Sequence, residues 1–112
     1  MSDTIFAKII RKEIPAKVVF ESETVLAFQD IAPQAPTHIL VIPKKAIKDI
    51  TSAVNSDREL LGELLLAARD IAQKQGLTDY RLVINNGAQA GQSVFHLHVH
   101  ILGGRSFDWP PG

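Results

Sequence analysis

Three of the four histidines of this 112-residue chain stand at alternate positions, in the run His96-Leu97-His98-Val99-His100. An extended strand turns alternate side chains to one side, so this spacing predicts a row of imidazoles opposite Leu97 and Val99. An imidazole has an unperturbed pKa of about 6.5 and can attack, donate or accept near neutral pH. The row therefore predicts a catalytic or ligand-binding site rather than ordinary core packing.

The fourth histidine, His38, opens another predicted strand that can lie beside the histidine run. Four imidazoles offer one nucleophile and further groups to surround a charged substrate. They also suit a zinc site, because two histidines at alternate strand positions and a third nitrogen can hold that ion. The chain has no cysteine, and Asp30 is the only carboxylate flanking a predicted ligand. We therefore expect no metal and no cofactor.

A turn with two glycines, Gly87 to Gln92, directly precedes the histidine run. Such turns can direct backbone N–H groups at an anion, and Gln92 and Ser93 add side-chain donors. A turn of this kind more often only joins two strands. Its position beside the histidines favours a phosphate site, with phosphorus as the centre under attack.

A group of apolar residues can form a slot for a nucleobase, and a carboxylate lies close to one of them in the sequence. The apolar residues are Ile5, Phe6, Ile9 and Phe28, and the carboxylate is Asp30. A carboxylate at the mouth of such a slot can accept hydrogen bonds from ribose hydroxyls. Apolar residues at helical spacing are as often plain core, so both interpretations stay open.

The composition favours one globular domain with local ligand recognition. Apolar residues make up 46% of the chain, and twelve basic side chains cancel twelve acidic ones. A net charge of zero removes the broad positive field that binds nucleic acid non-specifically. The sequence has neither a secretory signal nor a stretch of membrane-spanning length, and the absence of cysteine fits a reducing compartment. We expect a cytoplasmic protein that binds neither nucleic acid nor a membrane.

Hydrophobic periodicity predicts two helices and about five strands. Asp3 or Thr4 caps the first helix and Pro15 stops it, while a capping box at 56–59 precedes a second helix over 60–76. Strands are predicted at 18–21, 25–29, 38–42, 80–85 and 94–102. Because most of these elements are joined by short turns, they predict an α+β fold with a single antiparallel sheet.

The residues described so far resemble the histidine-triad (HIT) family. The run from His96 to Leu102 matches the family pattern of three histidines alternating with apolar residues. Segments along nearly the whole chain are similar to the Hint branch, the histidine-triad nucleotide-binding proteins. These segments are Asp3–Phe6, Ile9–Lys17, Asp30–His38, Gly91–Ser93, Gly103–Arg105 and Trp109–Gly112.

The resemblance implies a homodimer whose two sheets join into one, each subunit being a single domain over residues 1–112. It implies hydrolysis of purine nucleoside phosphoramidates to a nucleoside 5'-monophosphate and an amine, through a nucleotidyl-histidine. By position, His98 is the nucleophile, His38, His96 and His100 surround the phosphate, and Ser93 helps the leaving amine. The implied nucleotide contacts are Ile5, Phe6, Ile9, Phe28, Asp30, Ile31, Asn85, Gly91, Gln92, Ser93, His98 and His100.

The C-terminal tail, residues 103–112, is expected to place Trp109 against the partner subunit's active site, with docking on its own subunit as the alternative. Two departures from relatives narrow the function. The chain lacks the paired N-terminal cysteines that help some bacterial members bind zinc, and it has His100 where the nucleotidyl-transferring branch has glutamine. Two functions stay open beside the phosphoramidase: a dinucleoside polyphosphate hydrolase, and a nucleotide-binding regulatory or scaffold protein.

Overall fold

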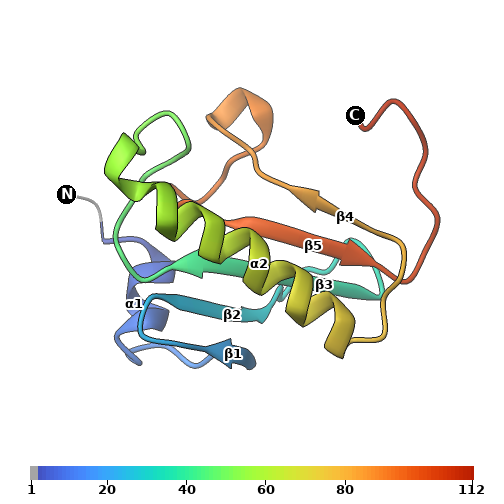
Figure 1. Cartoon of the computed structure of the whole chain (residues 1–112), viewed down its shortest axis with the longest axis horizontal. Coiled ribbons are helices and arrows are strands. Elements are labelled where there is room, and N and C mark those ends of the chain that lie inside the picture. The colour runs from blue at the N-terminus through green and yellow to red at the C-terminus, as the bar shows by residue number, and fades with distance from the viewer. Residues whose placement is uncertain (1–2) are drawn as a thin grey trace.

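A five-stranded antiparallel sheet with one long helix across it forms the body of the protein (Figure 1). The computed structural model describes residues 3–112. The elements are α1 (Ile5–Ile10), β1 (Val18–Glu21), β2 (Val25–Gln29), β3 (Thr37–Pro43), α2 (Arg58–Lys74), β4 (Tyr80–Val83) and β5 (Val99–Gly103), with 3-10 turns at Asn55–Asp57 and Ala88–Ala90. The strands lie in the order β1-β2-β3-β5-β4. The predicted α+β class with a single antiparallel sheet is confirmed.

Side-chain alternation along the central strands divides the core into two layers. The layer under α2 holds Val25, Ala27, Ile39, Val41, Leu97, Val99 and Ile101. The opposite layer holds Leu26, Phe28, Leu40 and Ile42, together with Phe6 and Ile9 from α1. Because α1 has only six residues and α2 has seventeen, α1 covers much less of its face of the sheet.

The first helix is shorter than the sequence predicts. Thr4 caps it, as predicted, by accepting a backbone N–H bond of 3.1 Å. At the other end Lys12 takes a left-handed φ of 64°, and the N–H of Glu13 donates to the carbonyl of Lys8 at 2.9 Å. This bond satisfies a carbonyl at the helix end, so the helix stops before it reaches Pro15.

The carboxylate of Asp57, rather than the hydroxyl of Ser56, satisfies the backbone ahead of α2. The predicted capping box at 56–59 is wrong, because a 3-10 turn occupies this place and Ser56 makes no capping bond. Asp57 accepts the N–H of Val54 at 2.9 Å and the ammonium of Lys45 at 2.6 Å. A carboxylate that accepts from the N–H three residues earlier stabilises the turn that starts the helix.

Strand β5 begins at Val99, whereas the sequence predicts a start at residue 94. The preceding segment leaves the ladder because the N–H of Leu97 donates to the carbonyl of Ile47 at 2.7 Å, in the loop after β3. The predicted strand position of His96 and His98 is therefore wrong. The alternation nevertheless persists, since Leu97 packs under α2 while His98 lies against Phe6 of the opposite layer.

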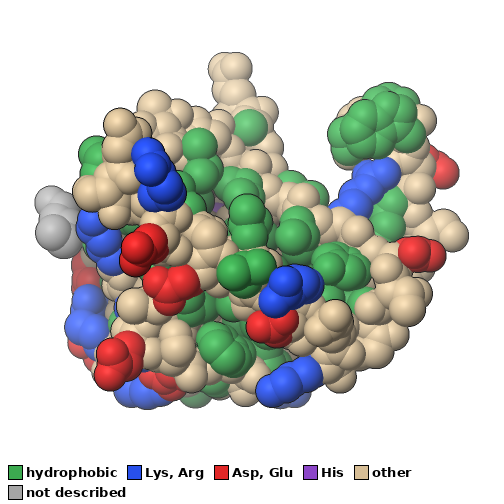
Figure 2. Space-filling model, viewed as in Figure 1, with side chains coloured by type: hydrophobic (Ala, Val, Ile, Leu, Met, Phe, Trp, Pro, Cys, Tyr) green, Lys and Arg blue, Asp and Glu red, His purple; other side chains and the backbone are tan. Residues whose placement is uncertain are grey.

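The strand β4 forms an open edge of the sheet and ends two residues before the predicted position. Leu82 of β4 and Leu65 and Leu66 of α2 are exposed. Figure 2 shows hydrophobic side chains gathered over α2 and toward β4. An unpaired edge beside exposed apolar side chains is a surface suited to pairing with another strand. No helix within residues 3–112 is long and apolar enough to cross a membrane.

We expect Asp57→Ala to lower the free energy of unfolding by about 1–2 kcal/mol, because the N–H of Val54 loses its acceptor. Ser56→Ala, which removes an exposed hydroxyl only, is expected to change it by less than about 0.5 kcal/mol. Urea denaturation of both variants beside the wild type provides the comparison. A larger loss for Ser56→Ala would return the capping role to Ser56.

Candidate active site

Three imidazoles and one aromatic ring meet on the side of the sheet that α1 only partly covers. The ring of His100 lies 4.9 Å from that of His98 and 5.1 Å from that of His38, between centroids. Phe6 of α1 stands edge-on to His98 with 5.0 Å between centroids. Phe6, His38, His98 and His100 therefore come together, from α1, from β3, and from β5 and the residue before it.

One nitrogen of His98 is fixed by the backbone. Its Nδ1 lies 2.7 Å from the carbonyl oxygen of His96. Because a carbonyl oxygen only accepts, Nδ1 carries the hydrogen and Nε2 of the neutral ring keeps its lone pair. His98 is 6% exposed, so the backbone bond holds a nearly buried ring in one tautomer and one orientation. This is the state that a nucleophilic imidazole requires.

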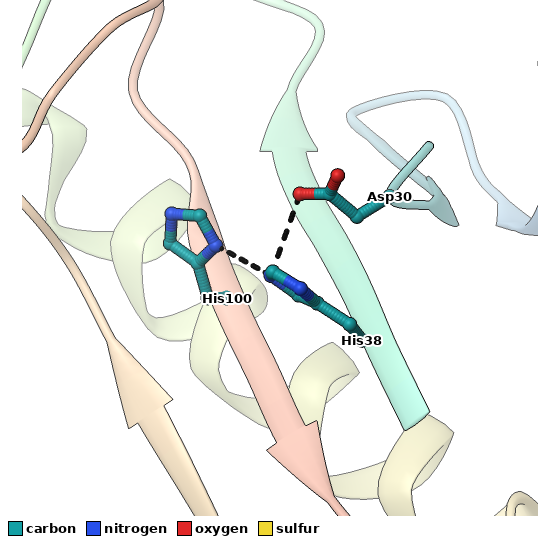
Figure 3. A group of neighbouring side chains, drawn as sticks. All are labelled: Asp30, His38 and His100. Carbon is teal, nitrogen blue, oxygen red and sulfur yellow. Dashed lines mark hydrogen bonds and ion pairs between the residues drawn. The ribbon is translucent and has the colours of Figure 1, made fainter. Parts of the chain in front are cut away.

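A second chain of hydrogen bonds fixes His38 and His100 (Figure 3). The backbone N–H of Gln34 donates to Nδ1 of His38 at 3.0 Å, so neutral His38 carries its hydrogen on Nε2. That nitrogen donates to Nδ1 of His100 at 2.9 Å and also lies 3.4 Å from Oδ2 of Asp30. His100 must therefore carry its own hydrogen on Nε2, the nitrogen directed away from His38. Within residues 3–112, this series of hydrogen bonds leaves the Nε2–H of His100 free to donate to a ligand.

His96 has a different environment from the other two members of the run. Its Nε2 donates to the carbonyl oxygen of Pro43 at 2.8 Å, and the side chain is 3% exposed. This bond joins the segment before β5 to the last residue of β3. His96 therefore fixes the backbone whose carbonyl orients His98, and its ring stands edge-on to Phe6 with 6.2 Å between centroids.

Burial lowers the pKa of all four histidines. For His100, burial and the neighbouring His98 and His38 together lower the pKa to about 4. The carboxylate of Asp30 acts in the opposite direction on His38, His98 and His100, but burial outweighs it. The imidazoles are therefore neutral at pH 7, and the lone pair on Nε2 of His98 is available.

A cavity of about 390 Å³ is walled by α1, β2 and the segment before β5, and none of the four histidines lines it. Phe6, whose ring contacts His98, joins the cavity to the imidazoles. Every residue predicted to form the base slot lines the cavity, together with the predicted ribose and leaving-group contacts; these are Ile5, Phe6, Ile9, Phe28, Asp30, Ile31 and Ser93. Sequence reasoning missed Ile14, Pro15, Ala16, Gln29, Leu40 and Val94. Leu40 was detectable, because it lies two residues from His38 on one strand and so shares its face.

The turn that was expected to present N–H groups to a phosphate is closed on itself. The N–H groups of Ala90, Gly91 and Gln92 donate to carbonyls of Gly87 and Ala88 within the turn. The side-chain amide of Gln92 is also committed, since it accepts from the N–H of residue 87 and donates to the carbonyls of residues 48 and 94. These donors brace the turn, and the predicted free anion loop is not present.

Ser93 follows that turn and lines the cavity, and among residues 3–112 its hydroxyl makes no hydrogen bond. Asn85 lies against Gly91, where an added Cβ would sit 3.5 Å from Nδ2 of the asparagine, and neither residue lines the cavity. Trp109 is 82% exposed and lies on the tail, outside the cavity of its own subunit. Ser93 is therefore the polar donor that this segment offers to a ligand.

A metal ion would compete with the hydrogen bonds of the site. Asp30, His38 and His100 each offer one possible ligand atom, and these three atoms lie within 4.8 Å of one another. This spacing is close enough for all three to bind one metal ion. Both nitrogens of His38 are already used, Nδ1 by Gln34 and Nε2 by His100. A metal at this place would displace the hydrogen that joins the two imidazoles, so the donor set fits the hydrogen-bonded arrangement better.

A family model described as the HIT domain matches residues 11–107, and the chain belongs to the HIT family. An uncharacterized HIT-like protein of Synechocystis is 60% identical over 98% of this chain and 97% of its own length. A 14 kDa zinc-binding protein of Zea mays is 57% identical over 99% of this chain and 89% of its own length.

Solved structures agree with this assignment. A HIT family hydrolase of Legionella pneumophila superposes with a TM-score of 0.94 at 53% identity, covering 96% of this chain and 98% of its own. A HIT family hydrolase of Clostridium thermocellum superposes with a TM-score of 0.91 at 40% identity, covering 100% and 97%. The predicted family is therefore confirmed.

We expect the free energy of unfolding to fall as the pH is lowered from about 6.5 towards 4, because the folded imidazoles bind fewer protons than the unfolded ones. Each proton taken up on unfolding contributes a slope of about 1.4 kcal/mol per pH unit. Above pH 6.5 the histidines of both states are neutral and the effect ends. Urea denaturation between pH 7.5 and about 5.5 measures the slope above the range where the carboxylates titrate.

The matched control for this pH dependence is His100→Gln, which keeps an acceptor for His38 and removes the imidazole whose pKa is about 4. The pH slope of the free energy of unfolding of this variant is expected to be smaller than that of the wild type by up to about 1.4 kcal/mol per pH unit, which is the contribution of one proton. A wild-type stability that stays constant between pH 7 and about 5.5 would contradict the buried neutral imidazoles.

Proposed function

We propose that this chain belongs to the Hint branch and hydrolyses purine nucleoside phosphoramidates, as an adenosine 5'-monophosphoramidase-type enzyme acting on P–N bonds. The products are a nucleoside 5'-monophosphate and an amine. Two similar solved structures are of HIT family hydrolases, which supports hydrolysis as the reaction class.

The observation that carries the proposal is the backbone bond from Nδ1 of His98 to the carbonyl of His96, beside an apolar cavity. It leaves a neutral Nε2 as the nucleophile, and Phe6 joins this imidazole to the cavity wall. A purine fits the apolar wall, and the carboxylate of Asp30 at the mouth suits ribose hydroxyls.

In the first step Nε2 of His98 attacks phosphorus, an N–P bond forms and the P–N bond to the amine breaks. The N–H on Nε2 of His100 donates to a phosphoryl oxygen and stabilises the charge that develops there. The departing nitrogen takes up a proton, for which the hydroxyl of Ser93 is the donor in reach of the cavity. The product of this step is a nucleotidyl-histidine.

In the second step water attacks the same phosphorus, the N–P bond to His98 breaks, and one proton of the attacking water returns to the oxygen of Ser93. The nucleoside monophosphate leaves and the imidazole returns to its neutral form. Two displacements with a good leaving group in each replace one difficult displacement, which is the gain of covalent catalysis. No metal and no cofactor takes part.

We further propose that the active form is a homodimer of one-domain subunits joined through β4. The open edge of β4 and the exposed Leu65, Leu66 and Leu82 support it. Pairing two β4 edges would continue the sheet across the dimer and cover these side chains. Trp109, which is 82% exposed on its own subunit, would then reach the partner's active site.

We expect His98→Ala to lower kcat/KM for an adenosine phosphoramidate by at least about a thousandfold, or about 4 kcal/mol, because the nucleophile is lost. Binding of adenosine monophosphate, measured by calorimetry, is expected to survive, since the cavity and Asp30 are untouched. Residual activity within about tenfold of the wild type, about 1.4 kcal/mol, would contradict the covalent mechanism.

The same assay separates the alternatives. The substrate panel includes dinucleoside polyphosphates. If one of them turns over faster than every phosphoramidate, the chain is a dinucleoside polyphosphate hydrolase instead. A wild type that binds nucleotide but hydrolyses no member of the panel would favour the scaffold. Activity that a chelator abolishes and zinc restores would contradict the metal-free mechanism.

We expect Ser93→Ala to slow substrates with a poor amine leaving group more than substrates with a good leaving group. The hydroxyl helps only when the departing nitrogen needs a proton in the transition state. The measurement is kcat for an alkylamine phosphoramidate beside a nitrophenyl ester of the same nucleotide. Equal slowing of both would assign Ser93 a structural role.

A further inference from the structure

The C-terminal tail is held by stacked cationic and aromatic side chains. The guanidinium of Arg81, on β4, lies 5.1 Å from the ring centroid of Phe107 and 5.8 Å from that of Trp109. It also donates to the backbone carbonyl of Asp108, between the two rings. The guanidinium of Arg105 lies 4.2 Å from the ring centroid of Phe107 as well. The tail is therefore attached to the sheet through Arg81 on the edge strand.

The tail is not held by burial of its tryptophan. Trp109 is 82% exposed, and Figure 2 shows the tail standing clear of the body, with hydrophobic side chains at its end above basic ones. A cation over an aromatic face is attractive without burial, and a guanidinium is planar and can stack between rings. Arg81 therefore holds the segment from Phe107 to Trp109 by stacking and one backbone hydrogen bond, while Arg105 ties the start of the tail to the carbonyl of Gln34 at 3.1 Å.

The register of the sheet places Arg81 on the same face as the imidazoles. Arg81 lies opposite Leu102 in the pairing of β4 with β5, and Leu102 lies opposite His38 in the pairing of β5 with β3. Residues directly opposite one another in an antiparallel pair project to one face. The tail is therefore anchored on the histidine face, at the open edge of the sheet.

The symmetry of an antiparallel edge pairing determines which subunit's imidazoles a tail anchored at this edge can approach. Two β4 edges related by a two-fold axis continue one sheet only if the axis is perpendicular to it. Such an axis keeps the histidine faces of both subunits on the same side. Figure 1 shows the tail extending past β4 on the side away from β5, so across such an axis it leads towards the imidazoles of the partner.

We propose that Arg81 is a positioning residue that aims Trp109 at the leaving-group side of the partner's active site, and so sets substrate preference. The inference rests on the proposed homodimer and phosphoramidase activity. Arg81 touches no reacting atom. It acts by restricting the directions open to the tail, which lowers the conformational entropy that Trp109 loses when it docks.

The chain has one tryptophan, so its fluorescence reports on the tail alone. Arg81→Met keeps an unbranched stem and removes the guanidinium, while Arg81→Lys keeps the charge and removes the plane. Arg58→Met removes a charge from the start of α2, far from the tail along the chain, and serves as the matched control. Each full-length variant is measured for acrylamide quenching and anisotropy of Trp109, dimer mass and melting temperature.

Arg81→Met is expected to raise the quenching constant of Trp109 and to lower its anisotropy, with the dimer mass unchanged. Arg81→Lys is expected to fall between Arg81→Met and the wild type, and Arg58→Met to match the wild type. Quenching and anisotropy that stay at wild-type values in Arg81→Met overturn the anchoring role. This readout needs no substrate, so it stands even if the wild type hydrolyses no phosphoramidate and the proposed function fails.

The second readout is kcat/KM for adenosine phosphoramidates with small and with bulky amines. Arg81→Met is expected to change the ratio between them by at least about threefold, or about 0.6 kcal/mol, while the affinity for adenosine monophosphate stays constant. Removal of residues 107–112 is expected to change the ratio in the same direction. A freed tryptophan with an unchanged ratio overturns the role of Arg81 in substrate preference.

Discussion

The hydrogen bond from Nδ1 of His98 to the carbonyl of His96 is the interaction on which the site depends. In a regular strand the carbonyl of His96 would point across to a neighbouring strand and accept a ladder hydrogen bond there. Here the segment has left the ladder, because the N–H of Leu97 donates to Ile47 and the side chain of His96 donates to Pro43. The irregular backbone thus frees the acceptor that fixes the tautomer of His98.

Burial has two opposite consequences at this site. It lowers the pKa of the four imidazoles and so keeps them neutral, as a nucleophile and a hydrogen-bonded pair require. It also removes polar rings from water, which costs stability unless each nitrogen finds a partner. The backbone groups of Gln34, His96 and Pro43 supply three of these partners. Loops of fixed conformation are therefore part of the site.

The sequence predicts the local features of this protein better than its loop contacts. Alternation correctly separates Leu97 from His98, and helical spacing correctly brings Phe6 to the cavity. The start of β5 could not be predicted, because it depends on a bond to Ile47, about fifty residues away in the chain. The self-closed turn was equally hidden, since its outcome depends on the side chain of Gln92 folding back onto the backbone. Local patterns specify faces, whereas non-local backbone bonds specify where a strand begins.

One face of the sheet packs under α2 and the other carries the imidazoles, and the edge strand β4 contributes side chains to both faces. Alternation along β4 directs Tyr80 to the core under α2 and Arg81 to the histidine face. Leu82 returns to the α2 side, where Leu65 is exposed as well. One strand can therefore place an apolar contact for a second subunit on one face and an anchor for the tail on the other. Since neighbouring residues of a strand cannot move independently, the proposed association at this edge and the direction of the tail would be mechanically linked.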